Sequence, residues 1–142
     1  MISLLLAAAL LTPSDAAYEA IKAKDGAERA ELFQDAVEQN IRPELRDRLA
    51  PIVASIRYVE NGKRYYFGII HKRCPKGYRP QAGWCAATVQ KNWDRWQKAG
   101  SKGEFVVFLS KRYCPVGADN DPNGLNKNWL PNLRKRLKRI IK

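Results

Sequence analysis

The segment 42–60 carries the pattern that most restricts how this chain can fold. Its apolar side chains recur at helical spacing along one face, and they are Leu45, Leu49, Ile52, Val53, Ile56 and Val59. This stripe predicts a helix that faces a core. Pro51 lies inside the segment and predicts either a kink or the first turn of that helix. Asn61-Gly62 follows directly and is a strong turn signal.

Other segments repeat the helical period. We expect further helices within 17–40, with a break at Lys24-Asp25-Gly26, and within 81–100, 101–114 and 129–142. Ser101 and Glu104 stand in capping-box spacing at the start of the third of these segments. The aromatic and β-branched stretch 63–70 predicts a small β-hairpin, and 115–128 predicts a structured loop. The expected fold class is therefore mainly α (α+β), with a β-hairpin insertion after the 42–60 helix.

The length of 142 residues, 45% of them hydrophobic, is sufficient for one compact domain with a core. An apolar run from Ile2 to Leu11, followed by Ser14 and Ala16, predicts a secretory signal peptide over residues 1–16. No Lys or Arg precedes that run, so a buried first apolar helix or a truncated gene start explains the same residues. The expected mature domain is 17–142, exported to the periplasm or the exterior, or associated with a phage.

Charge indicates the class of partner. The 26 Lys and Arg residues against 14 Asp and Glu residues give a net charge of +12, which favours polyanionic surroundings. Six of the basic residues lie in the expected C-terminal helix. We interpret them first as the solvated face of a packed helix, and next as a surface that contacts an anionic cell wall or membrane. Nucleic acid is a less favoured partner, because no helix-turn-helix, RNP or zinc signature accompanies the charge.

The cysteines do not predict a metal site. Cys74, Cys85 and Cys114 lack the short spacing of a zinc knuckle. In an exported protein a Cys74–Cys85 disulfide is compatible with the spacing, and three reduced thiols in the core are the equal alternative. The one histidine, His71, is interpreted as structural. We expect no cofactor.

Glu60 raises a chemical question, because it stands four residues after Ile56, on the apolar stripe. Apolar neighbours and the negative end of the helix dipole both oppose ionisation there, so its carboxyl should keep its proton to higher pH than a free glutamate. A protonated carboxyl is what a glycosidase needs to protonate a leaving oxygen. The alternative is that Glu60 turns outward, pairs with Arg57 or Lys63, and only ends the helix.

Three stretches of the sequence are informative when they are considered together, and they are IRYVENGKRYYFGI, QAGWCAATVQKNW and FLSKRYCPVGADNDPNGLNKNW. In order and content they resemble phage and prophage lysozyme-like proteins related to lytic transglycosylases, over about residues 45 to 133. In such enzymes the catalytic glutamate ends a long helix and precedes a small β region, and the matching position here is Glu60. The resemblance implies a lysozyme-like domain that cleaves peptidoglycan glycan strands between N-acetylmuramic acid and N-acetylglucosamine, as a lytic transglycosylase or a muramidase.

The resemblance also implies a second cleft wall around 113–126, where Tyr113, Asn120 and Asn126 are candidates to bind glycan hydroxyl and acetamido groups. Asp121, with Asp119, is a candidate for substrate contact or for a second carboxylate, and ordinary turn chemistry is the favoured interpretation. Trp84 lies off the stripe of its helix, where a sugar face could stack on it.

Two tryptophans and one glycine carry further expectations about packing. Trp93 and Trp96 lie on the helix stripe and are expected to pack in the core. Gly68 is expected where the backbone approaches another segment closely.

The competing functions are a basic nucleic-acid-binding module without catalysis, and a wall-binding lysozyme relative that has lost catalysis. We expect a monomer.

Overall fold

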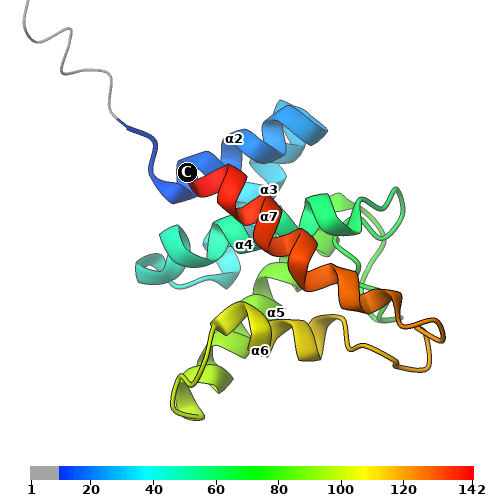
Figure 1. The fold of residues 1–142 in the computed structure, drawn as a ribbon. Coiled ribbons are helices and arrows are strands. Elements are labelled where there is room, and N and C mark those ends of the chain that lie inside the picture. Colours follow the sequence, from blue (N-terminus) through cyan, green and yellow to red (C-terminus); the bar gives the residue numbers. More distant parts are fainter. Residues whose placement is uncertain (1–9) are drawn as a thin grey trace, which may run out of the picture.

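The computed structural model describes residues 10–142, and in that range the chain is mainly helical. Figure 1 shows the arrangement of the helices. The elements are α2 (Pro13–Asp25), α3 (Ala27–Asn40), η1 (Pro43–Leu45), α4 (Arg46–Glu60), α5 (Tyr78–Lys98), α6 (Phe105–Tyr113), η2 (Leu125–Asn128) and α7 (Trp129–Ile141). None of the helices described is long and apolar enough to cross a membrane.

Helix α4 forms the centre of the fold. The sequence pattern predicted one buried face, but every residue from Leu49 to Arg57 is buried. The reason is that α2, α5 and α7 all pack against α4, and Figure 1 shows α7 crossing it. Pro51 lies inside α4 and not in its first turn. The last turn of α4 is therefore held from several sides.

The N-terminal helices begin and end where the local chemistry predicts. Thr12 caps α2 through a capping box with Asp15, and Pro13 occupies the start of the helix, where its missing N–H is harmless. The predicted break is confirmed, because α2 ends at Asp25 and α3 begins at Ala27. Residues 1–9 of the expected signal peptide lie outside the described residues. Ala16 lies within α2, and cleavage after it stays a prediction.

The expected β-hairpin is wrong: no residue of the described chain forms a strand, and 61–77 is a run of turns and bends. The side chain of Gln81 explains why. Its Oε1 accepts hydrogen bonds from the N–H groups of Phe67 (3.1 Å) and Ile69 (3.2 Å), and its Nε2 donates to the carbonyl of Ile69 at 2.7 Å. One buried amide thus satisfies the backbone groups that a partner strand would otherwise satisfy.

A buried ion pair ties this loop to the helices. Arg57 makes two hydrogen bonds to the carboxylate of Asp25, at 2.8 and 3.0 Å, and both side chains are buried. The same guanidinium donates to the carbonyls of Gly62 (3.1 Å) and Tyr66 (3.0 Å). The hydroxyl of Tyr78 donates to Asp25 at 2.8 Å. The end of α2, the end of α4, the loop and the start of α5 therefore meet at one charged pair.

The predicted capping box at Ser101 is also wrong. Helix α6 begins at Phe105, and Glu104 is its N-cap without a side-chain capping bond. Ser101 has a positive φ of 53°, and its N–H donates to the carbonyl of Trp96 at the end of α5. Glu104 pairs instead with Arg134 of α7 at 3.0 Å. Of the two residues that matched the local pattern, Ser101 therefore closes the end of α5 through its backbone, and Glu104 contacts α7.

Candidate active site

Glu60 is the last residue of α4, and Asn61 after it adopts the left-handed conformation that ends the helix. The side chain of Glu60 is half-buried. Its Oε1 accepts a hydrogen bond of 2.9 Å from Nε1 of Trp129, the first residue of α7. Neither Arg57 nor Lys63 forms an ion pair with Glu60: Arg57 is bound to Asp25, and none of the described ion pairs includes Lys63. The outward-facing alternative is therefore wrong.

The surroundings of Glu60 favour its neutral form. Burial raises the pKa of the Glu60 carboxyl, and the hydrogen bond from Trp129 opposes this in part, so that the pKa stays above its usual value. The neighbouring groups are neutral acids. Burial raises the pKa of the Cys114 thiol to about 11, and it raises the pKa of the Tyr113 phenol well above its ordinary value. The pKa of Glu60 is thus raised, as its position on the apolar stripe predicted.

Gly68 is the point at which the loop approaches this carboxyl. Its φ is +78°, and a Cβ built on it would lie 2.4 Å from Cδ and 2.7 Å from Oε2 of Glu60. Both distances are shorter than a van der Waals contact, so no side chain fits there while Glu60 keeps its position. The close backbone approach expected at Gly68 is confirmed, and the group approached is the candidate acid.

Glu60 opens onto a cleft of about 590 Å³. Three other predicted site residues also line it: Tyr113, Asn120 and Asn126. Tyr113 contributes mainly to the shape of the cleft, because its hydroxyl donates to the carbonyl of Phe67 and its ring stacks on Trp129 with centroids 5.4 Å apart. Asn126 donates to the carbonyl of Pro115 at 2.9 Å. The cleft also includes Lys63, Arg64, Tyr65 and Ile70 from the loop after α4.

Asp121, a predicted site residue, does not line this cleft and instead has a structural role in the loop that carries Asn126. It is buried, and its Oδ2 accepts hydrogen bonds of 3.1 Å from the N–H groups of both Gly117 and Asn126. Asp119 is exposed and is not among the residues that line the cleft. Turn chemistry is therefore the correct interpretation of Asp121. Among the described residues that line the cleft, Glu60 is the only one with a carboxyl group.

Trp84 is not part of this cleft. It lines a separate hollow with residues such as Arg79 and Lys91, and its ring lies against His71 with centroids 5.3 Å apart. The packing role predicted for Trp93 is confirmed, because it is buried with its ring 5.0 Å from that of Phe105. Trp96 packs against the same core.

Trp129 is the site residue that the sequence patterns missed. It stands at the start of the C-terminal segment, in which only the basic residues indicated a function. It is buried, and it contacts both Glu60 and Tyr113. The one local signal was its polar indole N–H, since most buried indole N–H groups donate a hydrogen bond.

The three cysteines are free thiols in this structure. Cys85 lies buried in α5, and burial raises the pKa of its thiol to about 12. The thiol of Cys74 instead lies 3.8 Å from Nε2 of Gln81. The disulfide alternative for Cys74 and Cys85 is therefore wrong, since Gln81 stands between the loop and the core. The described residues contain no cluster of three or more His, Cys, Asp or Glu that could hold a metal ion.

A comparison with known proteins found no family model, no curated protein and no solved structure that matches this chain.

Proposed function

We propose that this protein cleaves the glycan strand of peptidoglycan, with Glu60 as the general acid and base. The observation that supports this proposal most strongly is the environment of one carboxyl group, that of Glu60. Glu60 is half-buried, its pKa is raised by burial, and it opens onto a cleft that no second carboxyl of the described residues lines. The resemblance of 45–133 to lysozyme-like proteins supplies the substrate class.

The first chemical step is proton donation. Because the N–H of Trp129 donates to Oε1 of Glu60, the transferable proton is expected on Oε2. Protonated Oε2 would deliver this proton to the oxygen between N-acetylmuramic acid and N-acetylglucosamine while positive charge develops on the sugar ring. The carboxylate formed in this way would then act as the base for the second step.

The lack of a second carboxyl among the described residues of the cleft favours one of the two outcomes. The two-carboxylate scheme needs an Asp or Glu across the scissile bond, and Asp121 is occupied with the backbone of its own loop. The acetamido group of the substrate can stabilise the sugar cation instead. Glu60 would then take the proton of the sugar's C6 hydroxyl, which closes an anhydro ring, as in a lytic transglycosylase.

Substrate binding is assigned to the exposed side chains of the cleft. Tyr65 is 40% exposed and offers an aromatic face to a sugar ring. Asn120 is exposed, lines the same cleft and can hydrogen-bond an acetamido group. Lys63 and Arg64 can attract the carboxylates of the stem peptides. Export or association with a phage, which would bring the enzyme to this substrate, stays a prediction.

The test compares wild type with Glu60→Gln on purified peptidoglycan, with the released muropeptides identified by mass. Gln keeps the shape and still accepts from Trp129, but it cannot transfer a proton. We expect release to fall by at least about a hundredfold, as on loss of a general acid. Thermal unfolding of both proteins controls for folding. Anhydro ends would support the transglycosylase outcome, and reducing ends the muramidase outcome.

Two results would reject the proposal. Equal release by both proteins would show that Glu60 is not the acid. Binding to peptidoglycan without release by wild type would favour the wall-binding alternative without catalysis.

A further inference from the structure

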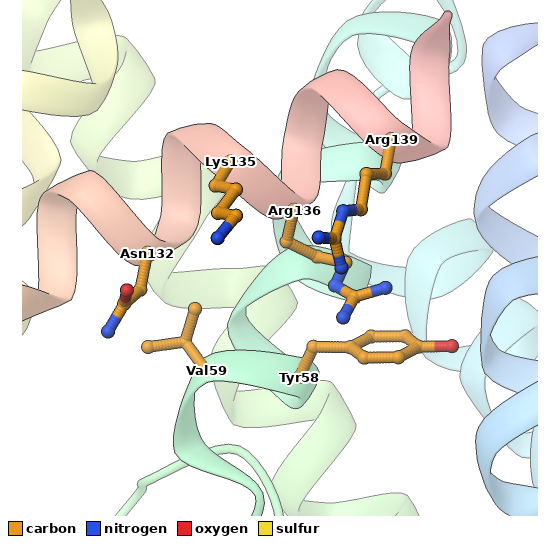
Figure 2. A pocket seen from close by; sticks show the side chains of 6 residues that line it. All are labelled: Tyr58, Val59, Asn132, Lys135, Arg136 and Arg139. Carbon is orange, nitrogen blue, oxygen red and sulfur yellow. The ribbon is translucent and has the colours of Figure 1, made fainter.

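A second hollow lies on the other side of the last turn of α4. It has a volume of about 260 Å³ and is lined by Tyr58, Val59, Asn132, Lys135, Arg136 and Arg139. Figure 2 shows these side chains, which come from the end of α4 and from one face of α7. It shares no lining residue with the Glu60 cleft, although Val59 directly precedes Glu60.

Cations converge on this hollow without matching anions. The guanidinium of Arg136 lies over the ring of Tyr58, with its carbon 4.0 Å from the ring centroid. Lys24, at the end of α2, lies 4.9 Å from the same ring. Among residues 10–142, none of the ion pairs formed includes Lys24, Lys135, Arg136 or Arg139.

The nearest carboxylate, Asp25, is already held by Arg57 and Tyr78. Burial lowers the pKa of the Lys24 ammonium, and the positive charges of Arg57 and Arg136 lower it further, whereas Asp25 raises it. The lowered pKa is expected where like charges lie close together.

This chemistry fits one phosphate group. The two guanidinium groups and the one ammonium group that line this small hollow can donate several charge-assisted hydrogen bonds to tetrahedral oxygens. The amide of Asn132 adds a neutral donor at the rim. A bound phosphate would also relieve the repulsion between the three cations that line the hollow. The hollow is small and lies between two helices, so it suits a single headgroup better than an extended strand.

The surroundings indicate where the phosphate comes from. Helix α7 packs on α2, and Figure 1 shows the C-terminal end of α7 close to the start of α2. At these two ends, large apolar side chains are exposed: Leu10 at 95%, Leu11 at 62% and Ile141 at 48%. Leu10 and Leu11 end the apolar run that begins at Ile2 in the sequence, so they contribute only in the chain that keeps residues 1–16. Exposed apolar groups beside a cationic face gain nothing from a dissolved polyanion, but they gain by entering the boundary of a bilayer.

We propose that the hollow between α4 and α7 binds the phosphate of an anionic lipid headgroup and places this face of the protein on a membrane surface. The Glu60 cleft shares no lining residue with this hollow and would stay open to substrate. The proposal does not depend on catalysis, so Glu60→Gln should bind vesicles as wild type does.

The test measures co-sedimentation of the full chain with vesicles of phosphatidylglycerol and phosphatidylcholine, and with vesicles of phosphatidylcholine alone. The variant is Lys135→Gln with Arg139→Gln, because both side chains are exposed and the contact of Arg136 with Tyr58 is retained. The matched control is Arg95→Gln with Lys98→Gln, which removes the same two charge types from exposed positions at the end of α5.

Wild type should bind only the anionic vesicles. Each cation removed from the hollow should weaken binding about fivefold, or about 25-fold for the pair. The control pair should weaken binding much less. Equal losses for the two pairs would show that net charge alone is responsible and would overturn the site. No binding to anionic vesicles would also overturn it. If single-stranded DNA at the same phosphate concentration displaces the protein from vesicles, the partner is a dissolved polyanion and the lipid assignment is wrong.

Discussion

The indole N–H of Trp129 and the carboxyl of Glu60 are joined by a hydrogen bond of 2.9 Å, which connects the first residue of α7 to the last residue of α4. These residues lie 69 positions apart in the chain. The bond orients the candidate acid, and it is also the one described interaction that lowers the pKa of this carboxyl against the effect of burial.

Replacing Trp129 by Phe should therefore raise the pKa of Glu60 further. The hydrogen bond stabilises the charged form, so its loss should move the high-pH limb of the kcat/KM profile upward by about one pH unit. Phe keeps an aromatic ring against Tyr113. The control is Trp93→Phe, because the Nε1 of Trp93 is buried without a partner and lies in the core. An unchanged limb in Trp129→Phe would mean that this bond does not tune the acid.

Gly68→Ala should reduce activity more than stability alone explains. The new Cβ would lie 2.4 Å from Cδ of Glu60, so either the carboxyl or the loop must move. Gly103→Ala is the matched control, because Gly103 has a similar φ of +72° and a Cβ added there would meet no heavy atom within 4 Å. Both variants should lose about 1 kcal/mol of unfolding free energy from the left-handed backbone.

Only Gly68→Ala should also lose most of its muropeptide release. If the two variants keep equal activity, then contact between Gly68 and Glu60 has no importance for catalysis.

Substitutions at Asp121 separate a structural role from a catalytic one. Asp121→Asn keeps an oxygen that can accept hydrogen bonds from Gly117 and Asn126, so its muropeptide release should stay within about threefold of wild type. A small loss is expected because hydrogen bonds to a neutral acceptor are only about half as strong as those to a carboxylate. Asp121→Ala leaves both N–H groups unpaired and should destabilise the protein by about 2 kcal/mol or more. Asp119→Asn should change neither property. Loss of activity in Asp121→Asn with unchanged thermal unfolding would instead identify a second catalytic carboxylate.

The buried pair of Asp25 and Arg57 should dominate stability in acid. Burial alone raises the pKa of Asp25, but hydrogen bonds from Arg57 and Tyr78 outweigh it and hold this pKa below its ordinary value of 3.8. The folded state therefore gains stability from the charged carboxylate above pH 3.8 and loses it as the pH falls below that value toward the folded pKa. Urea unfolding of wild type across this window should show the loss.

Asp25→Asn should be destabilised by about 3 to 5 kcal/mol near neutral pH, because it leaves a buried guanidinium unpaired. Its difference from wild type should shrink below pH 3.8. Asp35→Asn is the control, since its pair with Arg79 is 54% exposed on the carboxylate side and is expected to contribute less than about 1 kcal/mol. Equal losses in the two variants would contradict the role of the buried pair.

Sequence patterns located the helices because helical periodicity is a local property. The stripe that ends at Glu60, the break at Gly26 and the C-terminal basic helix all follow from residues within a few positions of one another. The same patterns predicted a small β-hairpin at 63–70, since aromatic and β-branched residues are typical of strands. The structure satisfies that backbone through Gln81, a residue that belongs to the next helix.

The candidate site also has features that follow from local sequence and features that depend on tertiary packing. The sequence by itself determined that Glu60 would end a helix on its apolar side, and therefore that the pKa of its carboxyl would be raised. Only the tertiary structure decided that Trp129 and Gly68 would enclose this carboxyl, that Asp121 would support a loop, and that Trp84 would face another hollow. The physical reason is that the helical period sets which face of a helix is buried, whereas the partner on that face depends on how distant helices pack together.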